Sequence, residues 1–284
     1  MRVQVILVPY DSGQKNVRMG RGPESFIQHG LSEVLRQDGH VVEVEQIDLR
    51  SSFSAEIGSA FELNRILSSR VRAAVDDKRF PIVLAGNCNC SVGTLAGVGH
   101  KEMGLVWFDG HGDFNTPETT VSGFLDGMAL AIATGRCWRN LSAGIPDFHP
   151  VAERDVILVG SRDFDQEEKN MLDGSGIALV SGTYIRHTNI VEALKPALVA
   201  LEPRVKQVHV HIDLDALDPG QTPANHLAPP DGLFPGEMEL AIRMIRGRFQ
   251  ISSACIAAYD PECDPHASTL EAGIKLMRII LREI

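Results

Sequence analysis

The feature that most constrains the fold is a short apolar segment that ends abruptly in side chains typical of metal ligands. Residues 104–108 read Gly-Leu-Val-Trp-Phe, and Asp109, His111 and Asp113 follow at alternate positions. Residues at alternate positions of an extended chain point to the same side. These three side chains can therefore converge beyond the end of a buried strand, where they suit a divalent cation such as Mn²⁺. A solvated turn is the alternative.

A second segment repeats this pattern. Residues 208–212 form an apolar-alternating run, and Asp213 and Asp215 follow it. Two strand ends with paired ligand-type residues provide donors for two metal ions, with one carboxylate from each strand bridging them. Burying this much negative charge without cations would be prohibitive. The two segments together therefore favour a two-metal site over a solvated turn. His209 and His211, inside the run, are expected in the core or behind the ligands.

Apolar segments alternate with amphipathic ones along most of the chain. The expected strands are 3–8, 41–44, 81–85, 104–108, 155–159, 178–180, 208–212 and 253–258, and the expected helices are 23–35, 59–75, one from 91, 125–134, 166–172, 190–201, 235–246 and 269–282. This order predicts a single α/β domain over residues 1–284, with a mostly parallel sheet and helices on both faces. Ligands of such sheets bind outside the carboxyl ends of the strands.

Composition limits the class of partner. A chain of 284 residues can bury a sizeable core, and its net charge of −10 argues against nucleic acid and anionic membranes as partners. We therefore expect a small-molecule substrate. No apolar run approaches a membrane span and the first residues lack a signal-peptide pattern, so the cytoplasm is the expected compartment. Five cysteines, an odd number, give no disulfide framework.

The two carboxylate segments resemble the signature motifs of the arginase and agmatinase (ureohydrolase) family. Residues 109–115 read Asp-Gly-His-Gly-Asp-Phe-Asn, and residues 213–219 read Asp-Leu-Asp-Ala-Leu-Asp-Pro. Residues 116–123 resemble the family's substrate loop, and residues 160–165 resemble its Gly-x-Arg-Asp-x-Asp segment. The resemblance covers nearly the whole chain. It implies the arginase fold, a hydrolase of C–N bonds in linear amidines, and a homo-oligomer, commonly a trimer or a hexamer.

The resemblance also implies two divalent metal ions, with Mn²⁺ expected and Ni²⁺, Co²⁺ or Zn²⁺ as alternatives. The ligands carried over are Cys88, Asp109, Asp113 and Asp213 for the first metal, and Asp109, His111, Asp213 and Asp215 for the second. Cys88 stands where the family has the His of a Gly-Gly-Asp-His segment. A cysteine also occurs there in a hydroxyarginine hydrolase branch of the family, which this chain resembles through residues 109–128.

Two interpretations of Cys88 remain open. Its thiolate is a working ligand, softer than imidazole and with an added negative charge. Alternatively, the first site is partly lost and Cys88 is a small buried residue. Cys90 replaces it if the register slips by two residues.

The substrate loop implies a substrate with an amino-acid end. Asn115, Thr120 and Ser122 match positions that hold an α-carboxylate in arginases, and Asp165 matches one that holds the α-amino group. Hydrogen bonding within the loop is the alternative role for Asn115 and Thr120.

Three positions bear on proton transfer and on recognition of the substrate head group. Asp126 replaces a His that shuttles protons in the family; it could serve if burial raised its pKa, or it could pair with a cationic substrate. His226, on the rim loop of residues 219–236, is the second candidate for the shuttle. Ala258 stands where the family has a guanidinium-binding Glu, so a guanidinium would lose a partner worth about 1.5–3 kcal/mol. Hydrolysis of plain arginine is therefore disfavoured.

These observations predict a dinuclear hydrolase of a guanidino, N-hydroxyguanidino, amidino or ureido compound with an amino-acid end. In the family, a hydroxide that bridges the metals attacks the trigonal carbon, and Asp215 helps to stabilise the tetrahedral intermediate. One alternative is a single-metal amide hydrolase that uses only the second site. The other is a non-catalytic binding protein of the same family, which the changes at Cys88, Asp126 and Ala258 motivate.

Overall fold

A parallel eight-stranded sheet forms the centre of the protein. The computed structural model describes residues 1–51, 53–99 and 102–282. The strand order is β4-β1-β5-β10-β9-β6-β7-β8, and every pair is parallel. The strands are β1 (Arg2–Val8), β4 (Val41–Gln46), β5 (Phe80–Ala85), β6 (Met103–Phe108), β7 (Val156–Val159), β8 (Ala178–Val180), β9 (Gln207–Asp213) and β10 (Gln250–Ala257), with a separate antiparallel pair of β2 (Tyr10–Asp11) and β3 (Gln14–Lys15). Residues 52, 100, 101, 283 and 284 of the predicted domain lie outside the described residues.

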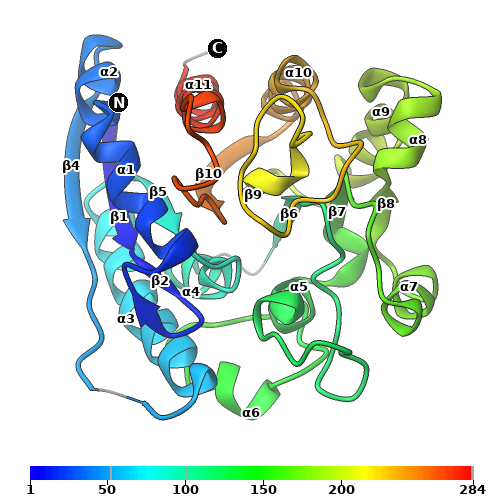
Figure 1. The fold of residues 1–284 in the computed structure, drawn as a ribbon, viewed down its shortest axis with the longest axis horizontal. Coiled ribbons are helices and arrows are strands. Elements are labelled where there is room, and N and C mark those ends of the chain that lie inside the picture. Colours follow the sequence, from blue (N-terminus) through cyan, green and yellow to red (C-terminus); the bar gives the residue numbers. More distant parts are fainter. Residues whose placement is uncertain (52, 100–101, 283–284) are drawn as a thin grey trace.

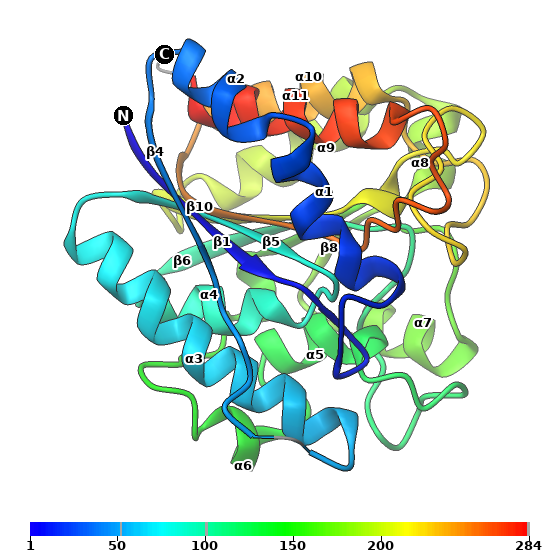
Figure 2. The same ribbon diagram turned by 60° about the vertical axis from the view of Figure 1, so that its left-hand side comes forward.

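Helices cover both faces of this sheet (Figures 1 and 2). One face carries α1 (Gly22–Gln28), α2 (Leu31–Gln37), α9 (Ile190–Leu201), α10 (Pro235–Arg246) and α11 (Ser268–Leu281), and the other carries α3 (Glu56–Asp76), α4 (Cys90–Val98) and α5 (Ala129–Ala133). The shorter helices are α6 (Arg139–Ser142), α7 (Gln166–Asp173) and α8 (Gly182–His187). The predicted α/β class is confirmed. Among the described residues, no helix is both long and apolar enough to cross a membrane.

The alternation of side chains along β9 explains how the site is positioned. Val208, Val210 and Ile212 pack into the core beneath α9, α10 and α11. His209 and His211 point to the opposite face, where both lie within hydrogen-bonding distance of Ser91 of α4. Successive side chains of a strand alternate between faces, so Asp213 continues the polar row toward the end of the strand. Both faces of β9 are covered, so His209 and His211 are buried as fully as the apolar residues between them.

One predicted helix is divided in two. The pattern predicted a single helix over residues 23–35, but α1 ends at Gln28 and α2 begins at Leu31. Gly30 lies between them in the left-handed conformation, with φ of 82°. This conformation ends a helix at little cost only in glycine and a few other residues. The apolar spacing continued across the break and therefore concealed it.

Candidate metal centre and active site

The predicted metal ligands gather where three buried strands end. Asp213 is the last residue of β9, Asp109 follows β6, and Cys88 lies on the loop between β5 and α4. Because β9 pairs with both β6 and β10, and β10 pairs with β5, these ends meet at one edge of the sheet. The side chains of the cluster are each no more than 6% exposed: Cys88, Asp109, Asp113, Asp213 and Asp215.

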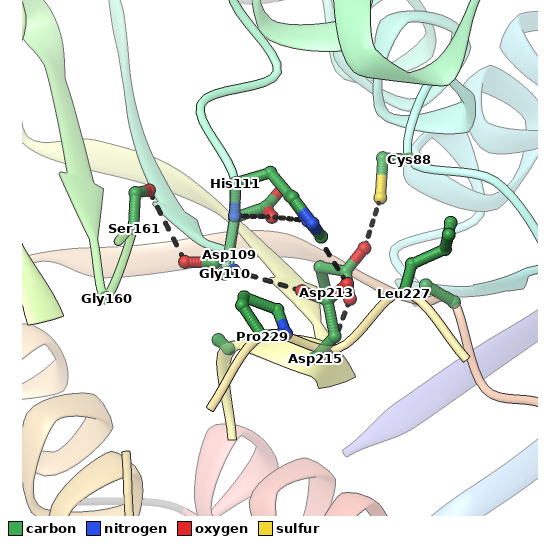
Figure 3. A network of polar contacts seen from close by, with 12 residues as sticks. Cys88, Asp109, Gly110, His111, Gly160, Ser161, Asp213, Asp215, Leu227 and Pro229 are labelled. Atoms are coloured by element: carbon green, nitrogen blue, oxygen red, sulfur yellow. Dashed lines mark hydrogen bonds and ion pairs between the residues drawn. The ribbon is translucent and has the colours of Figure 1, made fainter. Parts of the chain in front are cut away.

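Three of the four residues predicted for the second metal, Asp109, His111 and Asp215, offer ligand atoms within 4.8 Å of one another. His111 Nδ1 lies 3.3 Å from Asp215 Oδ2 and 3.5 Å from Asp109 Oδ1. Gly110 N donates to Asp215 Oδ1 at 3.0 Å, which joins the ends of β6 and β9 (Figure 3). Burial opposes ionisation of Asp215, but His111 more than offsets this and lowers the pKa of Asp215 to about 2. An ionised carboxylate, a second carboxylate and an imidazole form a donor set suited to a divalent cation.

Cys88 faces the same carboxylates. Its thiol donates to Asp213 Oδ2 at 2.9 Å, and Asp213 Oδ1 accepts a hydrogen bond from Asp215 N at 2.7 Å (Figure 3). Burial and the adjacent Asp213 carboxylate raise the pKa of the Cys88 thiol. Cys90, the alternative in a shifted register, begins α4 instead and is buried in the core.

The charge of the cluster fits bound divalent cations. Burial and neighbouring carboxylates raise the pKa values of Asp113 and Asp213 well above their ordinary range. Within the described part of the chain, Asp113 Oδ2 is buried and has no hydrogen-bond partner. Buried carboxylates are ordinarily paired or bound to metal. Divalent cations would compensate both the repulsion and the unpartnered oxygen.

Asp126 holds the loop that carries Cys88. Its Oδ2 accepts from Cys88 N and Asn87 Nδ2, both at 2.9 Å, and its Oδ1 accepts from Asn89 N at 2.9 Å and Asn89 Nδ2 at 3.2 Å. Burial raises the pKa of Asp126 to about 7, although the hydrogen bonds from Asn89 and Cys88 oppose the shift. With four donors on its two oxygens, Asp126 is placed to orient Cys88. Its predicted part in proton transfer stays a prediction.

The predicted substrate residues divide into two groups. Asn115 and Asp165 are together, since Asn115 Nδ2 donates to Asp165 Oδ2 at 3.0 Å beside Asp113. Thr120 and Ser122 lie further out, where their hydroxyls accept from Gly123 N at 3.0 Å and Phe124 N at 3.2 Å. The contact of Thr120, and the hydrogen bond that Asn115 Oδ1 accepts from Thr119 Oγ1 at 3.0 Å, lie within the loop, which is the alternative role predicted for Asn115 and Thr120.

The rim residues have partners of their own. His226 is exposed, and one of its ring nitrogens lies within 4.8 Å of ligand atoms of Asp260 and Cys263. Ala258 follows β10 with φ of 62° and is held by Asn225 Nδ2, which donates to its carbonyl at 2.8 Å. Glu262, one of the carboxylates near that position, pairs with Arg21 at the surface. The absence of a carboxylate at the position that matches the family's guanidinium-binding Glu stays a prediction from the sequence.

Two residues, Glu168 and Arg162, support the site although the sequence did not predict this role for them. Glu168 Oε1 accepts from Phe114 N at 2.8 Å, so it fixes the chain next to Asp113. The spacing Asp165-x-x-Glu168 signals a helix capping box and could have indicated this residue. Arg162 donates to the carbonyls of Asp215 (3.0 Å) and Pro229 (2.5 Å), among others. It thereby ties the turn after β9 to the rim loop.

The replacement Arg162→Met is expected to lower the free energy of unfolding by about 1–3 kcal/mol, because half-buried carbonyls lose their charged donor. Urea unfolding followed by circular dichroism measures this loss. Arg186→Met removes an ion pair with Glu237 and a cation–π contact with Phe234, and it serves as the control, with a smaller expected loss of about 1 kcal/mol. Equal losses in the two variants would contradict a structural role for Arg162.

On its fold and donor chemistry, the protein falls in the class of metal-dependent hydrolases. The sequence profile described as "Arginase family" matches residues 1–282. The chain is 29% identical to the arginase of Bacillus caldovelox, over 99% of this chain and 98% of that one, and 27% identical to the arginase of Staphylococcus aureus strain COL, over 97% and 95%. The crystal structure of Bacillus cereus arginase superposes with a TM-score of 0.91 at 28% identity, covering 100% and 99% of the two chains.

The chain belongs to the arginase family, whose members are hydrolases that act on C–N bonds of guanidino compounds. The resemblance inferred from residues 109–115 and 213–219 is thereby confirmed.

Proposed function

We propose that the protein hydrolyses a C–N bond in an N-hydroxyguanidino, amidino, ureido or guanidino compound that carries an amino-acid end. The observation that carries this proposal is the hydrogen bond of 3.0 Å between Asn115 and Asp165, because Asn115 follows Asp113 of the buried carboxylate cluster by two residues. An amide and a carboxylate at this point suit the α-carboxylate and the α-ammonium of an amino acid.

The residues of the cluster would bind the metal ions, and a rim residue would transfer a proton. Cys88 and Asp113 would hold one metal ion, His111 and Asp215 the other, and Asp109 and Asp213 would contribute to both. When bound, two such cations supply Lewis acidity that activates water and polarises the carbon under attack. Gly110 N and His111 hold Asp215 in place. His226, exposed at the rim, is the candidate that can exchange a proton with solvent and deliver it to the leaving amine.

The residue at position 258 bears on which reacting group of the substrate the site accepts. The methyl group of Ala258 cannot pair with a guanidinium, and Glu262 is engaged with Arg21. A neutral ureido group or a weakly basic N-hydroxyguanidino group loses less from this change than a guanidinium does. We therefore expect such compounds to be better substrates than arginine.

Matched pairs of compounds test the proposal, each with and without the α-carboxylate, on protein loaded with Mn²⁺, Co²⁺, Ni²⁺ or Zn²⁺. We expect kcat/KM for the amino acid to exceed that of its decarboxylated counterpart by about 10-fold or more, the value of one charge-assisted hydrogen bond. Asn115→Ala is expected to remove most of this preference through KM. Val121→Ala, a change at an exposed residue of the same loop, is the control.

Failure of every amidine and ureido compound on fully loaded protein would overturn the proposal and favour a binding role. One metal ion per chain in active protein would instead support single-metal chemistry at the group of Asp109, His111 and Asp215.

A further inference from the structure

His211 is a buried histidine with one unexplained nitrogen. It lies in β9 and is 0% exposed. Its Nδ1 lies 2.8 Å from Ser91 Oγ, whereas its Nε2 is buried without a hydrogen-bond partner among the described residues. Buried polar atoms are nearly always partnered, because an unpartnered one forfeits its hydration. The neighbouring His209 has partners for both nitrogens, Ser253 at 2.8 Å and Ser91 at 3.2 Å.

The surroundings of His211 show what its free nitrogen faces. A ring nitrogen of His211, Cys88 Sγ and a carboxylate oxygen of Asp109 lie within 4.8 Å of one another, and all three residues are buried. The ring of His211 stacks on Trp107 with centroids 3.7 Å apart, and Trp107 Nε1 donates to Asp109 Oδ2 at 2.9 Å. The stacking on Trp107 fixes the orientation of the imidazole ring. Because Nδ1 is in contact with Ser91 Oγ, Nε2 is the ring nitrogen available to bind a metal ion in the cluster.

We propose that His211 Nε2 is a ligand of the metal ion held by Cys88. His211 then supplies, from strand β9, the imidazole that the family takes from the position where this chain has Cys88. The position of His211 inside the strand predicts a residue in the core or behind the ligands, and the unpartnered nitrogen is the reason to revise that prediction. This inference deepens the metal centre of the proposed function and rests on that centre binding a metal ion.

The hydrogen bonds behind His211 suit this role. Histidine ligands ordinarily donate their second ring N–H to a fixed acceptor, which orients the ring and selects the tautomer. In the tautomers that suit a ligand role, His211 Nδ1–H would donate to Ser91 Oγ, the Ser91 hydroxyl to His209 Nε2, and His209 Nδ1–H to Ser253 Oγ. The three contacts form one continuous chain of donors, which leaves the lone pair of Nε2 directed at the cluster.

The donor set also gives the two metal sites different preferences. A thiolate and an imidazole with a carboxylate suit Zn²⁺ or Co²⁺ better than Mn²⁺. The group of Asp109, His111 and Asp215 contains no sulfur and suits Mn²⁺. We therefore expect the site of Cys88 and His211 to bind Zn²⁺ or Co²⁺ in preference to Mn²⁺ when the protein is given a mixture of these ions.

Nuclear magnetic resonance of ¹⁵N-histidine protein loaded with ¹¹³Cd²⁺ tests the assignment without any substrate. We expect a scalar coupling between cadmium and Nε2 of His211, assigned by its loss in His211→Gln. His209, on the same face of the same strand and equally buried, is the internal control and should show no coupling. Fully loaded protein without a coupling at His211 would overturn the proposal.

Metal affinity provides a second readout. Competition with a chromophoric chelator is expected to show Co²⁺ binding weakened by about 10-fold or more in His211→Gln and weakened less in His209→Gln, which acts on the metal only through Ser91. Equal weakening in both would mean that His211 serves packing only. If His211→Gln does not fold, His211→Cys retains a ligand atom and is expected to keep the metal while losing the coupling.

The outcomes separate this inference from the proposed function. A coupling at His211 in protein that hydrolyses none of the compounds would leave the ligand assignment standing and refute the proposed function. Turnover by protein with two metal ions but no coupling at His211 would refute the ligand assignment alone.

Discussion

Replacement of Asp213 by Asn is expected to lower kcat/KM by more than about 100-fold, because even residues that only orient a metal ligand contribute about 10- to 100-fold. Asp213 is 5% exposed, accepts from Cys88 Sγ and Asp215 N, and lies between the two groups of donors. Its loss should therefore affect both metal ions. Elemental analysis should find fewer than two metals per chain, and a turnover assay should find the corresponding loss of activity.

Asp218→Asn is the matched control for this change. Asp218 lies on the same turn, but its carboxylate accepts from Gly220 N at 3.0 Å and Gly232 N at 3.1 Å, outside the cluster. We expect it to retain full metal content. If Asp213→Asn bound two metals with unchanged affinity, Asp213 would not be a ligand, and the two-metal interpretation of the cluster would fail.

Asp126→Asn is expected to have the second-largest effect, a loss of metal affinity and turnover by about 10- to 100-fold, although Asp126 is assigned to neither metal. Its two oxygens accept four hydrogen bonds from the segment Asn87–Asn89, and an amide group would present N–H to two of those donors. The segment should then no longer hold the Cys88 side chain in the orientation that faces Asp213. The charge-transfer absorption of Co²⁺ bound to thiolate reports this directly, because it requires Cys88 at the metal.

Asp264→Asn is the control, since Asp264 is another buried carboxyl that accepts backbone N–H groups, in the segment before α11. It should leave the cobalt–thiolate absorption unchanged. A different result for Asp126→Asn would identify a proton shuttle instead: unchanged absorption and metal content, with a lowered kcat and an altered pH profile of kcat.

The sequence alone indicated much of the fold and the ligand cluster, because both depend on local patterns. Apolar runs that end in alternating carboxylates predicted β6, β9 and the side to which Asp109 and Asp213 point, since alternation is a property of any extended strand. The helix boundaries were less well determined. Gly30 ends α1 through its own conformation, which the apolar spacing of its neighbours does not report.

The roles of several site residues depended on contacts between distant segments. Asp126 was considered for proton transfer, but its partners lie 37 to 39 residues away in the chain. Arg162 contacts carbonyls more than 50 residues away. A sequence pattern records the type of side chain at each position, whereas the partner of a buried carboxylate or guanidinium depends on which loops the sheet brings together.

The amino-acid sequence by itself determined the fold class, the family and the positions of the carboxylates, because periodicity and motif spacing are encoded within single segments. Only the tertiary structure decided that Cys88 faces Asp213 while Cys90 enters the core, and that Asp126 saturates its oxygens on the Cys88 loop. It also decided that His211 keeps one nitrogen unpartnered, as far as the described residues show. The physical reason is that burial and hydrogen-bond saturation are properties of a packed environment, to which residues from β5, β6, β9 and α4 contribute together.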